Sequence, residues 1–68
     1  MKKGDKLMCI KDLYKSTYEE NAFDAGKEYI VSDIDKFYWV TDNMGNPFTF
    51  TILHVWGICD LLEYFKEI

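Results

Sequence analysis

The chain has 68 residues, a formal net charge of −4 and twelve aromatic side chains, which make up 18% of its sequence. A domain of this size buries only about 60% of the surface of its unfolded chain, so its core depends on a few large side chains. The acidic balance and the absence of arginine argue against nucleic-acid binding through phosphate contacts, and no apolar run reaches the roughly 18 residues of a membrane span.

The N-terminus and the cysteines bear on where the protein resides. The N-terminal lysines lead directly into Gly4-Asp5, without the apolar stretch of a secretory signal. Cys9 and Cys59 lie 50 positions apart and belong to no CxxC or Cys/His cluster of the kind that binds zinc. We therefore expect a cytoplasmic protein with two unpaired thiols, no disulfide, no metal and no cofactor.

The first predicted strand spans residues 6–11 and follows Gly4-Asp5, where glycine permits a tight entry. Residues 12–25 then break both the helical and the strand periodicity, which predicts a long loop without secondary structure of its own. A loop of this length needs an anchor that offsets the entropy lost on ordering it. Phe23, between two small alanines and the turn at Gly26, is predicted to be that anchor and to be buried.

Residues 26–50 contain the clearest pattern in the chain, an antiparallel meander. Its strands are predicted at 29–34, 37–41 and 48–52 from their β-branched and aromatic residues. The alternation shifts phase near residues 32–34, which predicts a β-bulge. The turn at 42–46 is expected to hold Gly45 in the left-handed conformation, and Pro47 suits the first position of an edge strand.

The C-terminal region has no single interpretation. Residues 53–57 predict a turn that ends at Gly57. Apolar residues then recur at the i, i+3, i+4 and i+7 spacing of an amphipathic helix, while residues 62–68 equally fit a short closing strand. A short 3₁₀ or helical turn is therefore expected near the C-terminus, and the last element is either a short closing strand or a helix; the helical spacing is carried by Ile58, Leu61, Leu62 and Phe65.

These segments together resemble the small SH3-like β-barrel proteins of bacteriophages and prophages. The resemblance is carried by Lys3-Gly4-Asp5 before a short strand, by the polar loop, by the run from Gly26 to Val31, and by the run from Trp39 to Gly45. It covers nearly the whole chain. It implies an all-β fold over residues 1–68, a single SH3-like domain that forms a five-stranded, partly open barrel with a long loop after the first strand.

Catalytic chemistry has few candidate residues. His54 is the sole histidine, and the groups that could join it as nucleophile or orienting residue are Cys9, Cys59 and Asp60. Nothing in their spacing matches a protease signature, so we expect a protein that is not an enzyme.

The acidic, aromatic loop is the predicted partner-binding surface. It places rings beside carboxylates, and the neighbouring strand would add an aromatic floor; Tyr and Trp are enriched among the residues that dominate binding interfaces. Proline-rich peptides are one candidate ligand, although the Ala-Leu-Tyr-Asp-Tyr run of eukaryotic SH3 domains is absent. The residues of this predicted surface are Tyr14, Tyr18, Glu19, Glu20, Phe23, Tyr38 and Trp39.

Two classes of function follow. The first is a small non-catalytic interaction or regulatory module, phage-encoded and acting on a host protein. The second is a nucleic-acid-related role, because residues 1–15 carry a net charge of +3 and residues 16–35 one of −5. The chain would then be a weak binder through Lys2, Lys3, Lys6 and Lys11, or an acidic mimic of nucleic acid through residues 19–35.

A weak homodimer is also predicted. A barrel of this size is not expected to hide twelve aromatic rings, and monomers rarely expose contiguous apolar area beyond a few hundred Å². The rings expected to gather on adjoining strands are those of Phe37, Tyr38, Trp39, Phe48 and Phe50.

Overall fold

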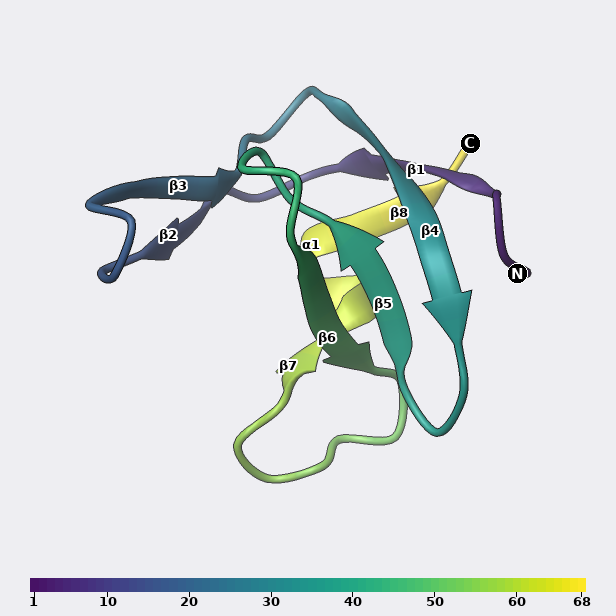
Figure 1. The fold of residues 1–68 in the computed structure, drawn as a ribbon. Coiled ribbons are helices and arrows are strands. Elements are labelled where there is room, and N and C mark those ends of the chain that lie inside the picture. Colours follow the sequence, from purple (N-terminus) through teal and green to yellow (C-terminus); the bar gives the residue numbers. More distant parts are fainter.

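The computed structural model describes residues 1–68 and shows a mostly β protein with one helical turn near its C-terminus (Figure 1). Eight strands are present, where five were predicted. In chain order the elements are β1 (Lys6–Cys9), β2 (Leu13–Lys15), β3 (Glu20–Phe23), β4 (Glu28–Ile34), β5 (Tyr38–Thr41), β6 (Pro47–Thr51), β7 (Cys59–Asp60), α1 (Leu61–Tyr64) and β8 (Phe65–Glu67).

Six of the strands form one curled sheet, a half-barrel, in the order β7-β6-β5-β4-β1-β8. Neighbouring strands run antiparallel except β6 and β7, which pair in parallel at Phe50 with Cys59 and at Thr51 with Asp60. The chain therefore leaves the end of β6, makes an excursion through residues 52–58 and returns beside the strand it has just left. This excursion is the open loop at the bottom of Figure 1.

The meander β4-β5-β6 was predicted correctly, and so were two of its details. The register shifts between Val31 and Asp33 where a bulge was expected. Gly45 has a φ of 80°, which is the left-handed conformation that glycine adopts without strain. Pro47 does begin β6, but β6 is not an edge strand, because β7 pairs with its last two residues.

The segment 12–25 is a β-hairpin, so the prediction of a loop without secondary structure is wrong. β2 and β3 pair as a separate two-stranded sheet that projects from the main sheet (Figure 1). The strands have only three and four residues, so neither shows enough alternation to be recognised. The turn between them closes with the Tyr18 N–H donating to the Lys15 carbonyl at 3.0 Å, and Glu19 adopts a positive φ of 56°.

Phe23 is fully buried, which confirms its predicted role as an anchor. Its ring makes edge-to-face contacts with four other rings at centroid distances of 4.8 to 5.5 Å. These rings belong to β6 in one half of the sheet (β7-β6-β5) and to β4 and β8 in the other half (β4-β1-β8). Phe23 therefore joins the end of the hairpin to both halves of the sheet. The four rings are those of Tyr29, Phe48, Phe50 and Phe65.

The C-terminal segment combines the two predicted alternatives. Residues 61–64 form the single turn α1, and the next three residues form β8, which pairs antiparallel with β1. Leu61 and Phe65, both on the predicted helical spacing, are buried, whereas Leu62 is exposed. The turn brings the chain from one edge of the half-barrel, at β7, to the other edge, at β8.

Tyr18 fastens the hairpin to the turn between β5 and β6. Its hydroxyl donates to Asp42 Oδ2 at 2.8 Å and accepts from Asn46 Nδ2 at 3.0 Å. The other oxygen of the buried Asp42 accepts the backbone N–H groups of Met44 and Asn46. One carboxylate therefore shapes the turn and holds the hairpin.

Replacing Tyr18 by phenylalanine should lower the free energy of unfolding by about 1 to 2 kcal/mol, because Asp42 loses a hydrogen bond to a charged oxygen in a half-buried site. Urea unfolding followed by circular dichroism measures this change. Tyr14→Phe is the matched control, since the Tyr14 side chain is exposed. Equal stability of the two variants would contradict the anchoring role of Tyr18.

Candidate functional site

The loop of residues 52–58, which we call the apolar loop, carries four of the large apolar side chains that the molecule exposes. Residues 52–57 are all exposed. Trp56 is 97% exposed and Leu53 77% exposed, and Ile52 and Val55 are each exposed by more than two fifths. Four large apolar side chains in water within five residues require an explanation, because such groups usually mark an interaction site.

The apolar loop has a defined backbone. The Ile58 N–H donates to the Val55 carbonyl at 3.1 Å, which closes a turn with Trp56 and Gly57 at its centre. Gly57 has a φ of 82°, the value that the third position of a type II turn requires. Trp56 therefore occupies the second position of a hydrogen-bonded turn and is held away from the sheet.

His54 and Asp60 fasten the apolar loop to β7. His54 Nδ1 lies 2.8 Å from Asp60 Oδ2, and His54 adopts a positive φ of 54° that is uncommon for a residue with a side chain. At the start of the loop, the Leu53 N–H donates to the hydroxyl of the buried Thr51 at 3.1 Å. The first half of the loop is thus tied by side chains to the ends of β6 and β7.

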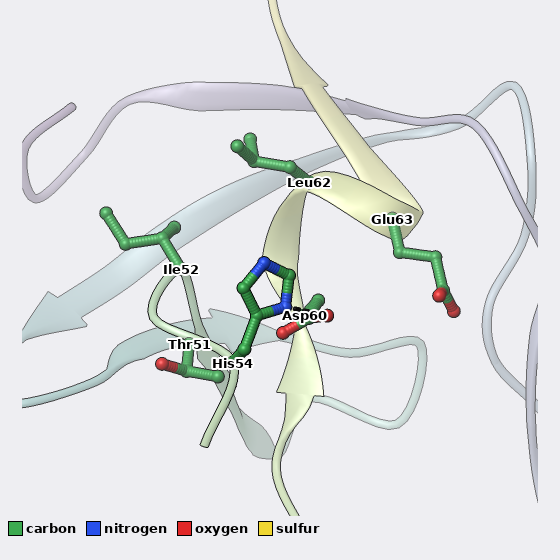
Figure 2. Close-up of a pocket in the computed structure, with 6 residues that line it drawn as sticks. All are labelled: Thr51, Ile52, His54, Asp60, Leu62 and Glu63. Atoms are coloured by element: carbon green, nitrogen blue, oxygen red, sulfur yellow. Dashed lines mark hydrogen bonds and ion pairs between the residues drawn. The ribbon is translucent and has the colours of Figure 1, made fainter. Parts of the chain in front are cut away.

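A cleft of about 290 Å³ opens between the apolar loop and α1 (Figure 2). The His54 ring stands between Ile52 and Asp60, and Leu62 lies across the cleft. The Glu63 carboxylate points away from His54 and pairs with Lys11 Nζ at 3.3 Å. The lining residues are Thr51, Ile52, His54, Asp60, Leu62 and Glu63.

The charge at this end of the molecule is negative. The turn between β4 and β5 lies at the same end of the sheet as the apolar loop (Figure 1). Asp33, near the end of β4, and Asp35, in the turn, are exposed beside one cation, Lys36. With Asp60, three carboxylates accompany this lysine, apart from Glu63, which is paired with Lys11. Residues 37–65 contain no lysine or arginine at all.

The predicted partner-binding residues do not form one surface. Tyr14 is exposed on β2, and Glu19 and Glu20 are exposed at the hairpin turn. Phe23 lies in the core, so no partner can reach its ring in this conformation. The hairpin contributes exposed charge and one exposed ring, but no continuous aromatic face.

The aromatic floor expected from β5 is also divided. Tyr38 pairs in register with the buried Phe50 and packs against the core, whereas Trp39 pairs with Thr49 on the opposite face of the sheet. The Trp39 indole N–H donates to Asp35 Oδ1 at 3.1 Å. On the hairpin, Lys15 Nζ lies 4.6 Å from the centroid of the Tyr18 ring and so covers it.

The aromatic patch predicted to drive dimerisation is absent. Phe50 is fully buried, and the other four rings of that set are partly buried on two faces of the sheet. Of the twelve aromatic side chains, Tyr14 and Trp56 are the exposed ones. The sheet thus covers its aromatic residues better than expected, and four of the eleven exposed large apolar side chains lie in the apolar loop. Dimerisation itself stays a prediction.

The candidate catalytic groups are only partly brought together. His54 meets Asp60, but neither cysteine forms a hydrogen bond with His54; the Cys9 thiol donates to the Lys11 carbonyl at 3.1 Å. Burial raises the pKa of both Cys9 and Cys59, and a nucleophilic cysteine requires the opposite shift. His54 therefore anchors the apolar loop through Asp60 and forms no hydrogen bond with a nucleophilic side chain.

The structure contains no cluster of three or more potential metal-ligating side chains. Both thiols are free. No helix has the length and apolar character needed to cross a bilayer.

Comparisons with protein-family models, with curated proteins and with solved structures found no match for this chain.

Four weakly acidic groups predict how stability changes with alkaline pH. Burial raises the pKa values of the Cys9 and Cys59 thiols above their ordinary 9.0 and those of the Tyr29 and Tyr64 hydroxyls above their ordinary 10.0. The folded protein therefore keeps these protons at a pH where the unfolded chain releases them. Stability should be unaffected below about pH 8 and should fall as the pH rises through about 9 and 10.

Urea unfolding at intervals from about pH 7 to about pH 11 measures this decline. Cys9→Ala serves as the control, because it removes one of the two thiols and should make the decline near pH 9 shallower. An unfolding free energy that stays constant over the whole range would contradict the burial of these groups.

Proposed function

We propose that this chain is a small non-catalytic protein-interaction module that binds its partner through the apolar loop. The observation that carries the proposal is the exposure of four large apolar side chains on one fastened loop, with Trp56 at its tip. Burying a large apolar side chain contributes about 1.5 to 3 kcal/mol. A partner that covers the loop therefore gains several such contributions to the binding free energy, because these side chains are not buried in the free protein.

The fastened backbone supports the proposal as well. Ordering a flexible loop on binding costs free energy, and a loop already held in one conformation avoids much of that cost. The turn at Trp56 and the contact of His54 with Asp60 hold the apolar loop in this way. Tryptophan is also among the residue types most enriched at the energetic centres of interfaces.

The proposal includes an SH3-like identity for the fold. It is supported by the order of the elements, in which a short first strand, a hairpin, a three-stranded meander and a helical turn precede a last strand that pairs with the first. A phage or prophage origin, a cytoplasmic setting and a regulatory action on a host protein belong to the same proposal. The origin and the regulatory action are supported by the sequence resemblance alone, and the cytoplasmic setting by the isolated cysteines.

The alternative role in nucleic-acid binding or mimicry gains no support from the arrangement of charges. Glu19 and Glu20 lie on the projecting hairpin, whereas Asp33 lies at the end of β4, so the acidic residues of 19–35 do not form one strip. Among the N-terminal lysines, Lys11 is already paired with Glu63. Neither arrangement resembles a continuous surface of one charge.

A library of random twelve-residue peptides displayed on phage particles tests the proposed function without a known partner. Selection on the immobilised protein should enrich peptides that bind it but do not bind the Trp56→Ala protein. Because the contact is mainly apolar, affinity should fall with salt far less steeply than that of a complex held by many phosphate contacts. Enrichment of the same peptides on both proteins, or of none on the native protein, would contradict the proposal.

A further inference from the structure

We propose that the partner segment presents a basic side chain, arginine or lysine, among apolar residues, and that Asp60 receives this side chain in the cleft beside the apolar loop. This inference rests on the proposed function and names the chemistry of the partner.

The hydrogen-bonding groups of the cleft favour a ligand that donates. An ionised carboxylate only accepts hydrogen bonds, so His54 Nδ1 carries the proton in its 2.8 Å contact with Asp60 Oδ2. The second oxygen of Asp60 makes no hydrogen bond within the protein. A guanidinium or ammonium group supplies the donor that this oxygen lacks.

The position of Asp60 makes such a contact stronger than an ordinary surface ion pair. Its side chain is 30% exposed, so it is partly shielded yet still reachable from the cleft. Glu63, the other carboxylate of the cleft, is directed away toward Lys11 and is already paired. Asp60 is therefore the available anion of the cleft.

The size and walls of the cleft fit one long side chain. A volume of about 290 Å³ lies at the lower limit of pockets that hold whole small molecules. Ile52 and Leu62 provide exposed apolar surface against which the methylene groups of lysine or arginine can pack. The basic group then reaches Asp60 while its stem remains against apolar atoms.

The wider charge distribution is complementary to a basic segment. Asp33 and Asp35 lie at the same end of the sheet as the apolar loop, with Lys36 beside them, and Lys11 near the cleft is paired with Glu63. An acidic partner would meet like charge here, and such repulsion is a common source of specificity. The face therefore favours a basic, apolar segment over an acidic one.

The test uses the peptides selected on the native protein. Peptides that depend on Trp56 should contain arginine or lysine next to tryptophan, leucine or phenylalanine more often than the starting library does. For one such peptide, Asp60→Asn in the protein should weaken binding by about tenfold or more, as expected for a hydrogen bond to a charged group. Glu20→Gln, a carboxylate removed on the distant hairpin, should change nothing.

A double-mutant cycle separates a direct contact from a general loss of structure. Replacing the basic residue of the peptide by glutamine should weaken binding to the native protein and should have no further effect on binding to the Asp60→Asn protein. Equal losses in both proteins would overturn the inference. Thermal unfolding of each variant confirms that the proteins compared are folded.

The outcomes distinguish the two proposals. Peptides that depend on Trp56 but carry no basic residue would support the proposed function and overturn this inference. Peptides that ignore Trp56 would overturn both. A second copy of the chain is another candidate occupant, and a dimeric mass in light scattering that becomes monomeric in the Trp56→Ala protein would also overturn the inference.

Discussion

Phe23→Ala should destabilise the protein by about 3 to 5 kcal/mol, the usual cost of removing a fully buried aromatic side chain. The ring contacts four others, so its removal leaves a cavity between the hairpin and both halves of the curled sheet. Native domains are stable by only about 5 to 15 kcal/mol, with small ones at the low end. The variant is therefore expected to be largely unfolded or close to its midpoint without denaturant.

Urea unfolding and near-ultraviolet circular dichroism measure this effect. Phe23→Leu should retain part of the lost stability, because it keeps the site apolar and partly filled. Tyr14→Ala is the matched control on the other strand of the same hairpin, and a change within about 0.5 kcal/mol is expected there because its ring is exposed. A Phe23→Ala protein as stable as the Tyr14→Ala protein would show that Phe23 does not hold the core.

Trp56→Ala should weaken binding of a selected peptide by at least about 2 kcal/mol, or roughly thirtyfold, which is the scale of an interface hot spot. The same substitution should leave the free energy of unfolding nearly unchanged, since the indole is 97% exposed and supports nothing in the free protein. Isothermal titration calorimetry gives the affinity, and urea unfolding gives the stability.

Tyr14→Ala again provides the comparison, because Tyr14 is the other exposed aromatic residue and belongs to the surface predicted from the sequence. We expect it to leave peptide affinity unchanged. If Tyr14→Ala weakens binding and Trp56→Ala does not, the partner binds at the hairpin and the apolar loop has another role.

The features that the sequence predicts correctly have strong local causes. Gly45 adopts a left-handed conformation, which glycine reaches without strain, and the phase shift in alternation near residues 32–34 directly reflects the bulge after Val31. The burial of Phe23 follows from the need of a polar segment for an anchor. In each case a few neighbouring residues are sufficient to determine the outcome.

The hairpin β2-β3 does not emerge from the sequence pattern because its stability is not local. Its strands are too short for a periodic pattern, and it is held by contacts with distant parts of the chain, such as that of Tyr18 with Asp42. The same reason explains β7, whose two residues become a strand only because β6 lies beside them. Short elements of this kind depend on tertiary neighbours that the sequence pattern does not show.

The proposed site lies in a different segment from the surface that the sequence favours, because composition alone does not separate core from surface. The apolar loop carries a visible signal nonetheless: five of its seven residues are aliphatic or aromatic, in a segment without strand or helix periodicity. The rings of β5 and β6, by contrast, are expected to be exposed and instead pack against the core or lie half-covered. An apolar segment that lacks periodicity is thus the better sequence indicator of exposed apolar surface in this chain.

Trp56 is exposed in the free protein and should become buried when a partner binds. Trp39→Phe leaves Trp56 as the single tryptophan, so its fluorescence and its quenching by acrylamide report on this one side chain. We expect strong quenching and the emission of a water-exposed indole in the free protein, then a blue shift and protection from acrylamide at saturating peptide. An indole already protected in the free protein, or one whose emission and quenching do not change at saturation, would contradict the claim.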